Sequence, residues 1–221
     1  METAPGALEL LQSGDLDGLR RLLDQDSAAS ESRDATGVSL LMHALYRGQR
    51  DLAELIARKK KALDQFEAAS LGRLDSLKKS IGEEIRREST AVNARSKDGF
   101  TALHFASYFG QPAAARVLIE NGAAVDAVAA NPTQVMPLHS AASARNLEAV
   151  RLLLEHGAPV NARQQSGWVP IHAAAQNGDR PMVELLLKHG ADPALTNADG
   201  KTPAAVAREK GHHEIAALLE A

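Results

Sequence analysis

Histidine is the residue with the most chemical potential in this chain, which contains eight histidines and no cysteine. His104, His139 and His172 recur at steps of 35 and 33 residues, and imidazoles can ligate metals or act as general acids and bases. The chain contains no H-E-x-x-H, G-x-S-x-G or P-loop sequence. Any histidine chemistry therefore depends on whether the fold brings these three side chains together.

The segments around the three histidines are copies of one phrase. The copies are F-T-A-L-H-F-A at 100–106, M-P-L-H-S-A-A at 136–142, V-P-I-H-A-A-A at 169–175 and a weaker K-T-P-A-A-V-A at 201–207. Gly122, Gly157 and Gly190 repeat at the same two steps, after V-L-I-E-N-G-A, L-L-L-E-H-G-A and L-L-L-K-H-G-A. Self-similarity at this period indicates a solenoid of stacked units.

The combined pattern of T-P-L-H-x-A-A, G-x-x-x-x-V-x-L-L-L and x-x-G-A-x-V-N-A resembles the ankyrin repeat family from residue 97 onward. The resemblance implies an all-α solenoid of about seven helix-turn-helix units joined by short β-hairpin fingers. It also implies binding through surface shape, without shared catalytic chemistry. The expected structural residues are Thr101 as a helix N-cap, His104, His139 and His172 near helix starts, and Gly122, Gly157 and Gly190 with positive φ after second helices.

The stacked arrangement argues against a histidine metal site. Neighbouring helices in such layers lie roughly 10 Å apart, whereas zinc–nitrogen bonds are about 2 Å long. Two histidines from successive units therefore cannot share one ion. We expect no catalytic residue, no metal and no cofactor.

We expect a single domain, residues 1–221, whose terminal units cap the stack. The approximate units are 4–33 (N-terminal cap), 34–64, 65–96, 97–129, 130–163, 164–196 and 197–221 (C-terminal cap), numbered one to seven below. In unit five, Arg145 replaces the glycine expected between the two helices. That unit should therefore be less stable than its neighbours.

The third unit is irregular at both ends. The chain runs from Leu63 to Ala69 in six residues, whereas the equivalent connection between units three and four, from Val92 to Ala106, takes fourteen. The finger near residue 65 should therefore be missing. About five extra residues around 82–91 are interpreted as a solvated extension of the second helix, with a partner-binding protrusion as the alternative. The cations at 58–61 are interpreted as complementing the negative end of a helix dipole, without an acidic partner.

Composition narrows the possible partners. A net charge of -3 provides no general attraction for nucleic acid or anionic lipid. No apolar run approaches the roughly 18 residues of a membrane helix, and the first ten residues do not resemble a signal peptide. We therefore expect a cytoplasmic protein that is a monomer on its own, with no nucleic-acid, membrane or metal partner.

Four of the seven aromatic residues fall between positions 100 and 109. In the ankyrin family, fingers and first helices form a concave partner-binding surface, and aromatic residues and arginine are typical of binding hot spots. The expected partner-binding residues are Tyr46, Arg47, Phe100, Tyr108, Phe109, Val135, Trp168, Gln176 and Asn177. Alternatively, Phe100, Phe105 and Phe109 fill the notch that the missing finger leaves.

The sequence thus predicts a non-enzymatic interaction module or scaffold that binds another protein through its concave face. The alternative is a regulatory subunit or inhibitor that occludes a partner enzyme's active site. An enzyme is less favoured, since no catalytic motif is present. A nucleic-acid binder is less favoured, since acidic residues such as Asp75 and Glu83 are interspersed among the cations of units two and three.

Overall fold

The computed structural model describes residues 6–85 and 91–221, and within these ranges the chain folds into paired helices. The α-helices are α1 (Ala7–Ser13), α2 (Leu16–Gln25), α3 (Leu40–Tyr46), α4 (Arg50–Lys59), α5 (Gln65–Leu71), α6 (Leu74–Ile85), α7 (Ala102–Tyr108), α8 (Pro112–Glu120), α9 (Pro137–Ser143), α10 (Leu147–Glu155), α11 (Pro170–Gln176), α12 (Arg180–Lys188), α13 (Pro203–Glu209) and α14 (His213–Glu220). Two 3₁₀ turns, η1 (Ser27–Glu31) and η2 (Ala91–Asn93), complete the helical elements. None of these helices has the length and apolar character needed to span a membrane.

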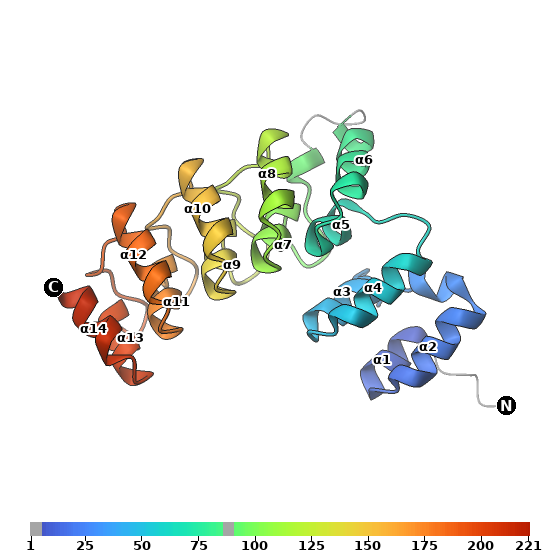
Figure 1. The fold of residues 1–221 in the computed structure, drawn as a ribbon, viewed down its shortest axis with the longest axis horizontal. Coiled ribbons are helices and arrows are strands. Elements are labelled where there is room, and N and C mark those ends of the chain that lie inside the picture. Colours follow the sequence, from blue (N-terminus) through green and yellow to red (C-terminus); the bar gives the residue numbers. More distant parts are fainter. Residues whose placement is uncertain (1–5, 86–90) are drawn as a thin grey trace.

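The helix pairs stack side by side into an arch (Figure 1). Odd-numbered helices, the first of each pair, lie toward the inner edge from α7 to α13, and even-numbered helices lie toward the outer edge. Successive first helices α5, α7, α9, α11 and α13 contact one another in order. The expected all-α solenoid is confirmed.

Local residue chemistry explains where the helices begin and end. Pro137 and Pro170 occupy the first positions of α9 and α11, where a missing N–H removes no hydrogen bond. After the second helices, Gly122, Gly157 and Gly190 adopt φ values of 89°, 82° and 86°, which residues with a Cβ rarely reach. The prolines and glycines of the repeated sequence therefore set where these first helices begin and where these second helices end.

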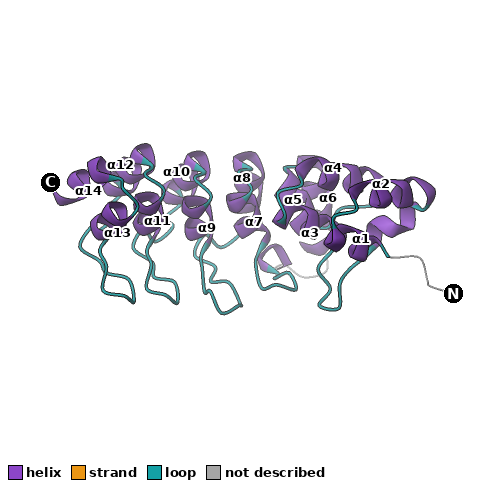
Figure 2. Ribbon diagram, turned by 90° about the horizontal axis from the view of Figure 1, so that it is seen from below, coloured by secondary structure: helices purple, strands orange, loops and turns teal. Residues whose placement is uncertain are grey.

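The fingers are tight turns. In one of them, the Ser96 amide donates to the Phe100 carbonyl at 2.8 Å, and the Gly99 amide donates to the Ser96 carbonyl at 3.0 Å. Among the described residues only isolated antiparallel bridges form, at Arg33–Ser39 and Arg95–Thr101. The fingers are thus present without β-strands, and Figure 2 shows them projecting to one side of the helices.

Only residues 60–64 connect α4 to α5, so the finger near residue 65 is indeed missing. Asp64 begins α5 directly, because its carboxylate accepts the amide protons of Phe66 at 3.0 Å and Glu67 at 2.9 Å. The hydrophobic core divides at the same place. One cluster belongs to α1–α4, with Leu71 and Phe105 added, and the other runs from α5 to α14.

The helix before the predicted insertion is long. Helix α6 has 12 residues, whereas α8 and α10 have 9 each. The helix therefore continues to Ile85, and Glu83 near its end is exposed. The rest of the predicted extension, through residues 86–90, lies outside the described part of the chain.

Candidate partner-binding site

The three repeated histidines connect neighbouring units. His104 Nδ1 accepts the backbone N–H of Thr101 at 3.2 Å, so the ring proton is on Nε2, which donates to the Val135 carbonyl at 3.0 Å. The next two histidines repeat the arrangement, with amide donors Met136 (3.1 Å) and Val169 (3.3 Å) and carbonyl acceptors Ala162 (2.9 Å) and Lys201 (3.0 Å). Each imidazole thereby joins the start of its own helix to the following finger.

These histidines are held neutral. Burial lowers the pKa of His104 to about 4 and also lowers the pKa of His139 and of His172. Both ring nitrogens of each side chain already serve in hydrogen bonds, so neither is free to ligate. Among residues 6–85 and 91–221, no three His, Asp or Glu side chains converge as a potential metal site.

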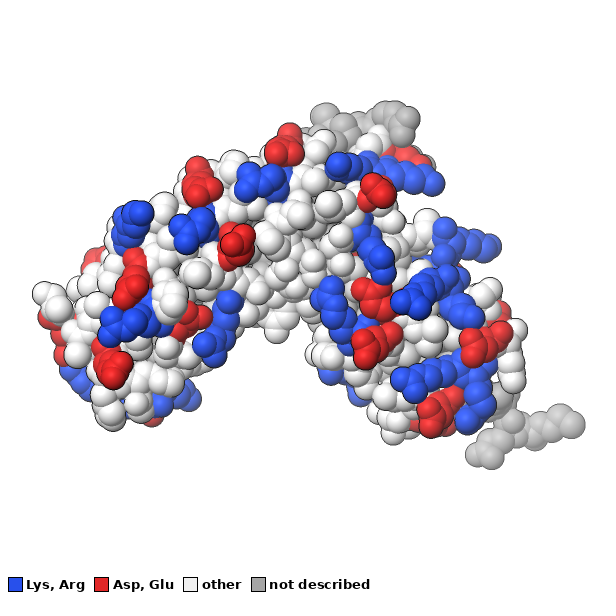
Figure 3. All heavy atoms as spheres, viewed as in Figure 1, with Lys and Arg blue, Asp and Glu red and all other residues white. Residues whose placement is uncertain are grey.

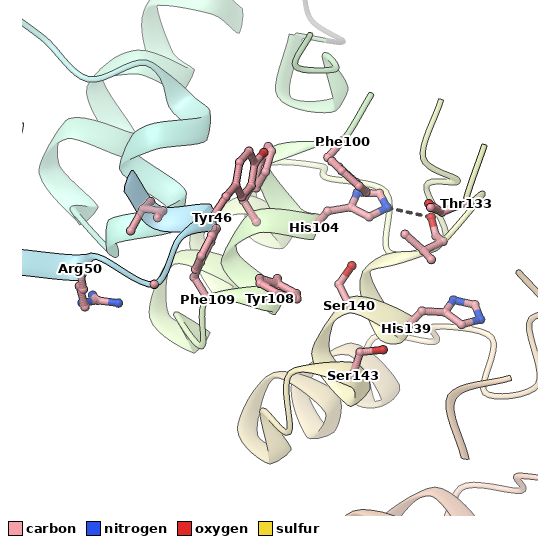
Figure 4. Close-up of a pocket in the computed structure, with 14 residues that line it drawn as sticks. Tyr46, Arg50, Phe100, His104, Tyr108, Phe109, Thr133, His139, Ser140 and Ser143 are labelled. Atoms are coloured by element: carbon pink, nitrogen blue, oxygen red, sulfur yellow. Dashed lines mark hydrogen bonds between the residues drawn. The ribbon is translucent and has the colours of Figure 1, made fainter. Parts of the chain in front are cut away.

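A cleft of about 540 Å³ opens on the inner face between α3, α7 and α9. Its predicted members are Tyr46, Phe100, Tyr108, Phe109 and Val135. Figure 4 shows Tyr46, Tyr108 and Phe109 on one side of the cleft, and Figure 3 shows that the hollow of the arch is largely uncharged. The structure thus brings together five of the nine predicted partner-binding residues.

The aromatic rings divide into buried and exposed groups. Phe105 is 4% exposed, and its ring makes edge-to-face contacts with Phe66 at 6.0 Å and Phe100 at 5.7 Å. Tyr108 is 51% exposed and meets Phe109 edge to face at 5.2 Å. Phe105 therefore fills the junction below the missing finger, whereas Tyr108 presents its ring to the cleft.

Tyr46 spans the position of the missing finger. It ends α3 in unit two, yet its hydroxyl donates to the carboxylate of Asp98 in the finger of unit four. Beside this contact, a Cβ on Gly37 would lie 3.1 Å from Lys97 Cγ, so the fingers of units two and four are direct neighbours. The absence of one finger therefore places the aromatic residues of two non-adjacent units around one cleft.

The other four predicted residues lie outside the cleft lining. Arg47 is exposed and follows Tyr46. Trp168 is half-buried against His172, with ring centroids 5.5 Å apart. Gln176 is exposed at the end of α11, and the side-chain amide of Asn177 donates to a backbone carbonyl of unit five. Three of these four residues, Trp168, Gln176 and Asn177, thus belong to unit six and lie apart from the cleft lining.

Sequence reasoning did not select Arg50, Thr133 or Ser140 for the site, although all three line the cleft. Arg50 begins a second helix, and second helices ordinarily lie on the outer edge of the stack. No local motif distinguishes these positions. Only the displacement of unit two against unit four places Arg50 at the cleft.

The cationic run at 58–61, at the end of α4, departs from the prediction that it has no acidic partner. The Lys60 side chain is 1% exposed, and its Nζ lies 2.7 Å from Glu31 Oε2 and 3.4 Å from Glu67 Oε1. Burial raises the pKa of Glu67, and the hydrogen bond from Lys60 lowers the pKa of Glu31. Lys60 therefore has acidic partners within the chain, at the junction without a finger.

Comparison with models of protein families identifies the repeats. Residues 65–164 match a family described as ankyrin repeats (3 copies), and residues 153–207 match ankyrin repeats (many copies). The chain belongs to the ankyrin repeat family.

Individual relatives match only in part. The chain is 42% identical over 79 residues to the B-cell lymphoma 3 protein homolog of Mus musculus, which covers 36% of this chain and 17% of that protein. It is 41% identical over 83 residues to human BCL-6 corepressor-like protein 1, covering 38% of this chain and 4% of that protein. A third relative is the ankyrin repeat domain-containing protein SAT10 of Stachybotrys chartarum, 28% identical over 153 residues, covering 67% of this chain and 8% of that protein. The chain thus spans less than a fifth of the length of these relatives.

Proposed function

We propose that the chain is a non-enzymatic module that binds another protein through its concave face. Ankyrin repeats indicate protein–protein interaction. The observation that carries the proposal is the cleft, where Tyr46 and Tyr108 remain 45% and 51% exposed although their rings are large and mostly apolar. Covering such rings is favourable, and tyrosine is enriched among residues that dominate binding energy.

The proposal includes the organisation of the module. We treat residues 1–221 as one domain of seven units, each corresponding to one helix pair, that acts as a cytoplasmic monomer until it meets its partner. The cleft lies where units two, four and five meet, and we assign Trp168, Gln176 and Asn177 to the outer part of the same contact surface. A binding face of this extent suits an interface of about 800 Å² per partner.

A regulatory role is the second candidate. One relative carries the name corepressor-like, and it shares 41% identity over 83 residues with this chain. Binding through the concave face would then change the activity of the partner, including by covering an active site. An activity assay on the captured partner, with and without the chain, separates regulation from simple attachment.

The test uses a substitution that fills the cleft without touching the core. Ser143 ends α9, lines the cleft and is exposed, so Ser143→Arg places a long charged side chain there. Ala113 is exposed on α8 at the outer edge, so Ala113→Arg is a matched control. We expect Ser143→Arg to weaken partner binding roughly 30-fold or more, as at a hot spot, and Ala113→Arg to leave it unchanged.

Affinity capture from native lysate, followed by titration of the captured protein, measures this effect. Circular dichroism establishes that both variants are folded. Equal capture by wild type and Ser143→Arg would contradict the assignment of the cleft. Adding Gln176→Arg then reports whether the contact surface extends into unit six.

A further inference from the structure

The cleft has an asymmetric charge. Of the 14 residues that line it, Arg50 is the single one with a permanent charge, and none is acidic. The two histidines in the lining, His104 and His139, are neutral because burial lowers the pKa of each. A ligand in this cleft therefore meets one cation and otherwise uncharged groups.

Arg50 is available to such a ligand. Its side chain is exposed, and neither Arg50 nor the nearby Arg47 has an ion pair or a hydrogen-bonded side-chain partner within the described ranges. The carboxylate of Asp98, at the edge of the cleft, is already bound by the hydroxyls of Tyr46 and Ser96. Both arginines thus lack an internal counter-charge.

The remaining walls favour an apolar side chain. Tyr46, Tyr108 and Phe109 supply ring surface on one side. On the facing helix, Ser140 and Ser143 supply small hydroxyl groups that can bond to a peptide backbone or side chain. Apolar walls with few polar groups are typical of sites that accept an anchoring side chain from a partner.

We propose that the cleft receives a segment of the partner protein in which a bulky apolar residue is flanked by carboxylates. The apolar residue packs between Tyr46 and Tyr108, and a carboxylate pairs with Arg50. A basic segment would place like charges against Arg50, which suppresses binding. This inference rests on the proposed function, because it names the chemistry of the partner at the same cleft.

The test begins with a phage-displayed library of random 12-residue peptides, selected against the whole folded chain. Only peptides whose binding is lost in Ser143→Phe, a neutral substitution that fills the cleft without adding a cation, count as cleft ligands. We expect these to be enriched in bulky apolar residues together with Asp or Glu, relative to the unselected library. The proposal is overturned if the selected peptides are basic or uncharged. It is also overturned if no selected peptide loses binding when Ser143 is substituted.

Charge reversal provides the second measurement. With a synthetic copy of the most enriched peptide in a fluorescence anisotropy titration, Arg50→Glu should weaken binding roughly tenfold and Arg50→Lys should retain most of it. Arg58→Glu is the matched control, because Arg58 lies on the same helix and is exposed, but does not line the cleft. Wild-type affinity should also fall as salt is raised, a measurement that needs no variant.

The outcomes separate the two proposals. Peptides that lose binding in Ser143→Phe but bind Arg50→Glu equally well leave the cleft as a partner site and overturn its acidic specificity. A lysate partner captured equally by wild type and Ser143→Arg removes the proposed function itself. A single-stranded oligonucleotide that binds the wild type and competes with the peptide also overturns the inference, since the cleft would then stack bases.

Discussion

Replacing His104 with glutamine should remove one part of the acid sensitivity of this fold, since the pKa values of His139 and His172 are lowered as well. Burial, together with the charge of Arg95, lowers the pKa of His104 from 6.5 to about 4 in the folded chain. The unfolded chain therefore takes up the proton first, and stability falls as the pH drops from about 6.5 to about 4. Above that window the contribution is fully present.

The magnitude follows from the shift. One pKa unit corresponds to about 1.4 kcal/mol, so the full contribution of His104 is about 3 kcal/mol. Linkage over the part of the window between about pH 7.5 and about pH 5 gives a loss of about 2 kcal/mol in the wild type. A glutamine side chain can accept from the Thr101 amide and donate to the Val135 carbonyl, and it does not titrate.

Urea unfolding followed by circular dichroism at several pH values measures the difference. We expect His104→Gln to be less stable near pH 7.5 by about 1 kcal/mol, through imperfect hydrogen bonds, yet to lose about 2 kcal/mol less than the wild type on acidification. Glu67, whose raised pKa acts in the opposite direction, is the same in both chains and cancels. Parallel stability curves for the two proteins would refute a neutral, buried His104.

Two backbone predictions concern stability alone. Gly99→Ala should lower the free energy of unfolding by about 2–3 kcal/mol, since φ is 88° and a Cβ would lie 2.8 Å from the Ala130 carbonyl. Gly122→Ala, with a similar φ but open space around the Cβ, should lower it by about 1 kcal/mol. Equal losses for the two variants in urea unfolding would contradict the clash at Gly99. Arg145→Gly should stabilise the chain by about 0.5 kcal/mol, because relief of the φ of 62° outweighs an exposed pair with Asp179. A lower melting temperature for Arg145→Gly would show that the ion pair dominates.

The sequence alone predicts those features of the structure that depend on residues close together in the chain. Pro170 begins α11 because its own ring favours the first helical turn, and Arg145 adopts a positive φ because the inter-helix turn requires one. These features depend on neighbours within a few positions, and the repeat displays them three times. The absence of the third finger also followed from residue spacing alone.

The junction of units two and three could not be predicted in the same way. Lys60 has the sequence context of a helix end, but its buried position depends on Glu31 of unit one and Glu67 of α5, which the repeat pattern does not predict as its neighbours. The cleft is a second example, since Tyr46 and Tyr108 belong to units that the repeat pattern keeps apart. The burial of Lys60 and the proximity of Tyr46 to Tyr108 result from the packing of several units, which the sequence of one unit does not reveal.

The repeated histidine also limits how units of this chain can be joined to one another. A histidine occurs at the third residue of α7, α9 and α11, each of which is followed by a finger whose carbonyl accepts its proton. At the same position α3 has Met42, and the finger after it is missing; α13 has Ala205, which needs no acceptor. A chimera cut after unit six would leave the Nε2–H of His172 unpaired, whereas one cut before unit four leaves all three histidine bonds intact. Recombination of such modules is therefore directional, because a unit whose first helix carries this histidine needs a following unit that brings a finger.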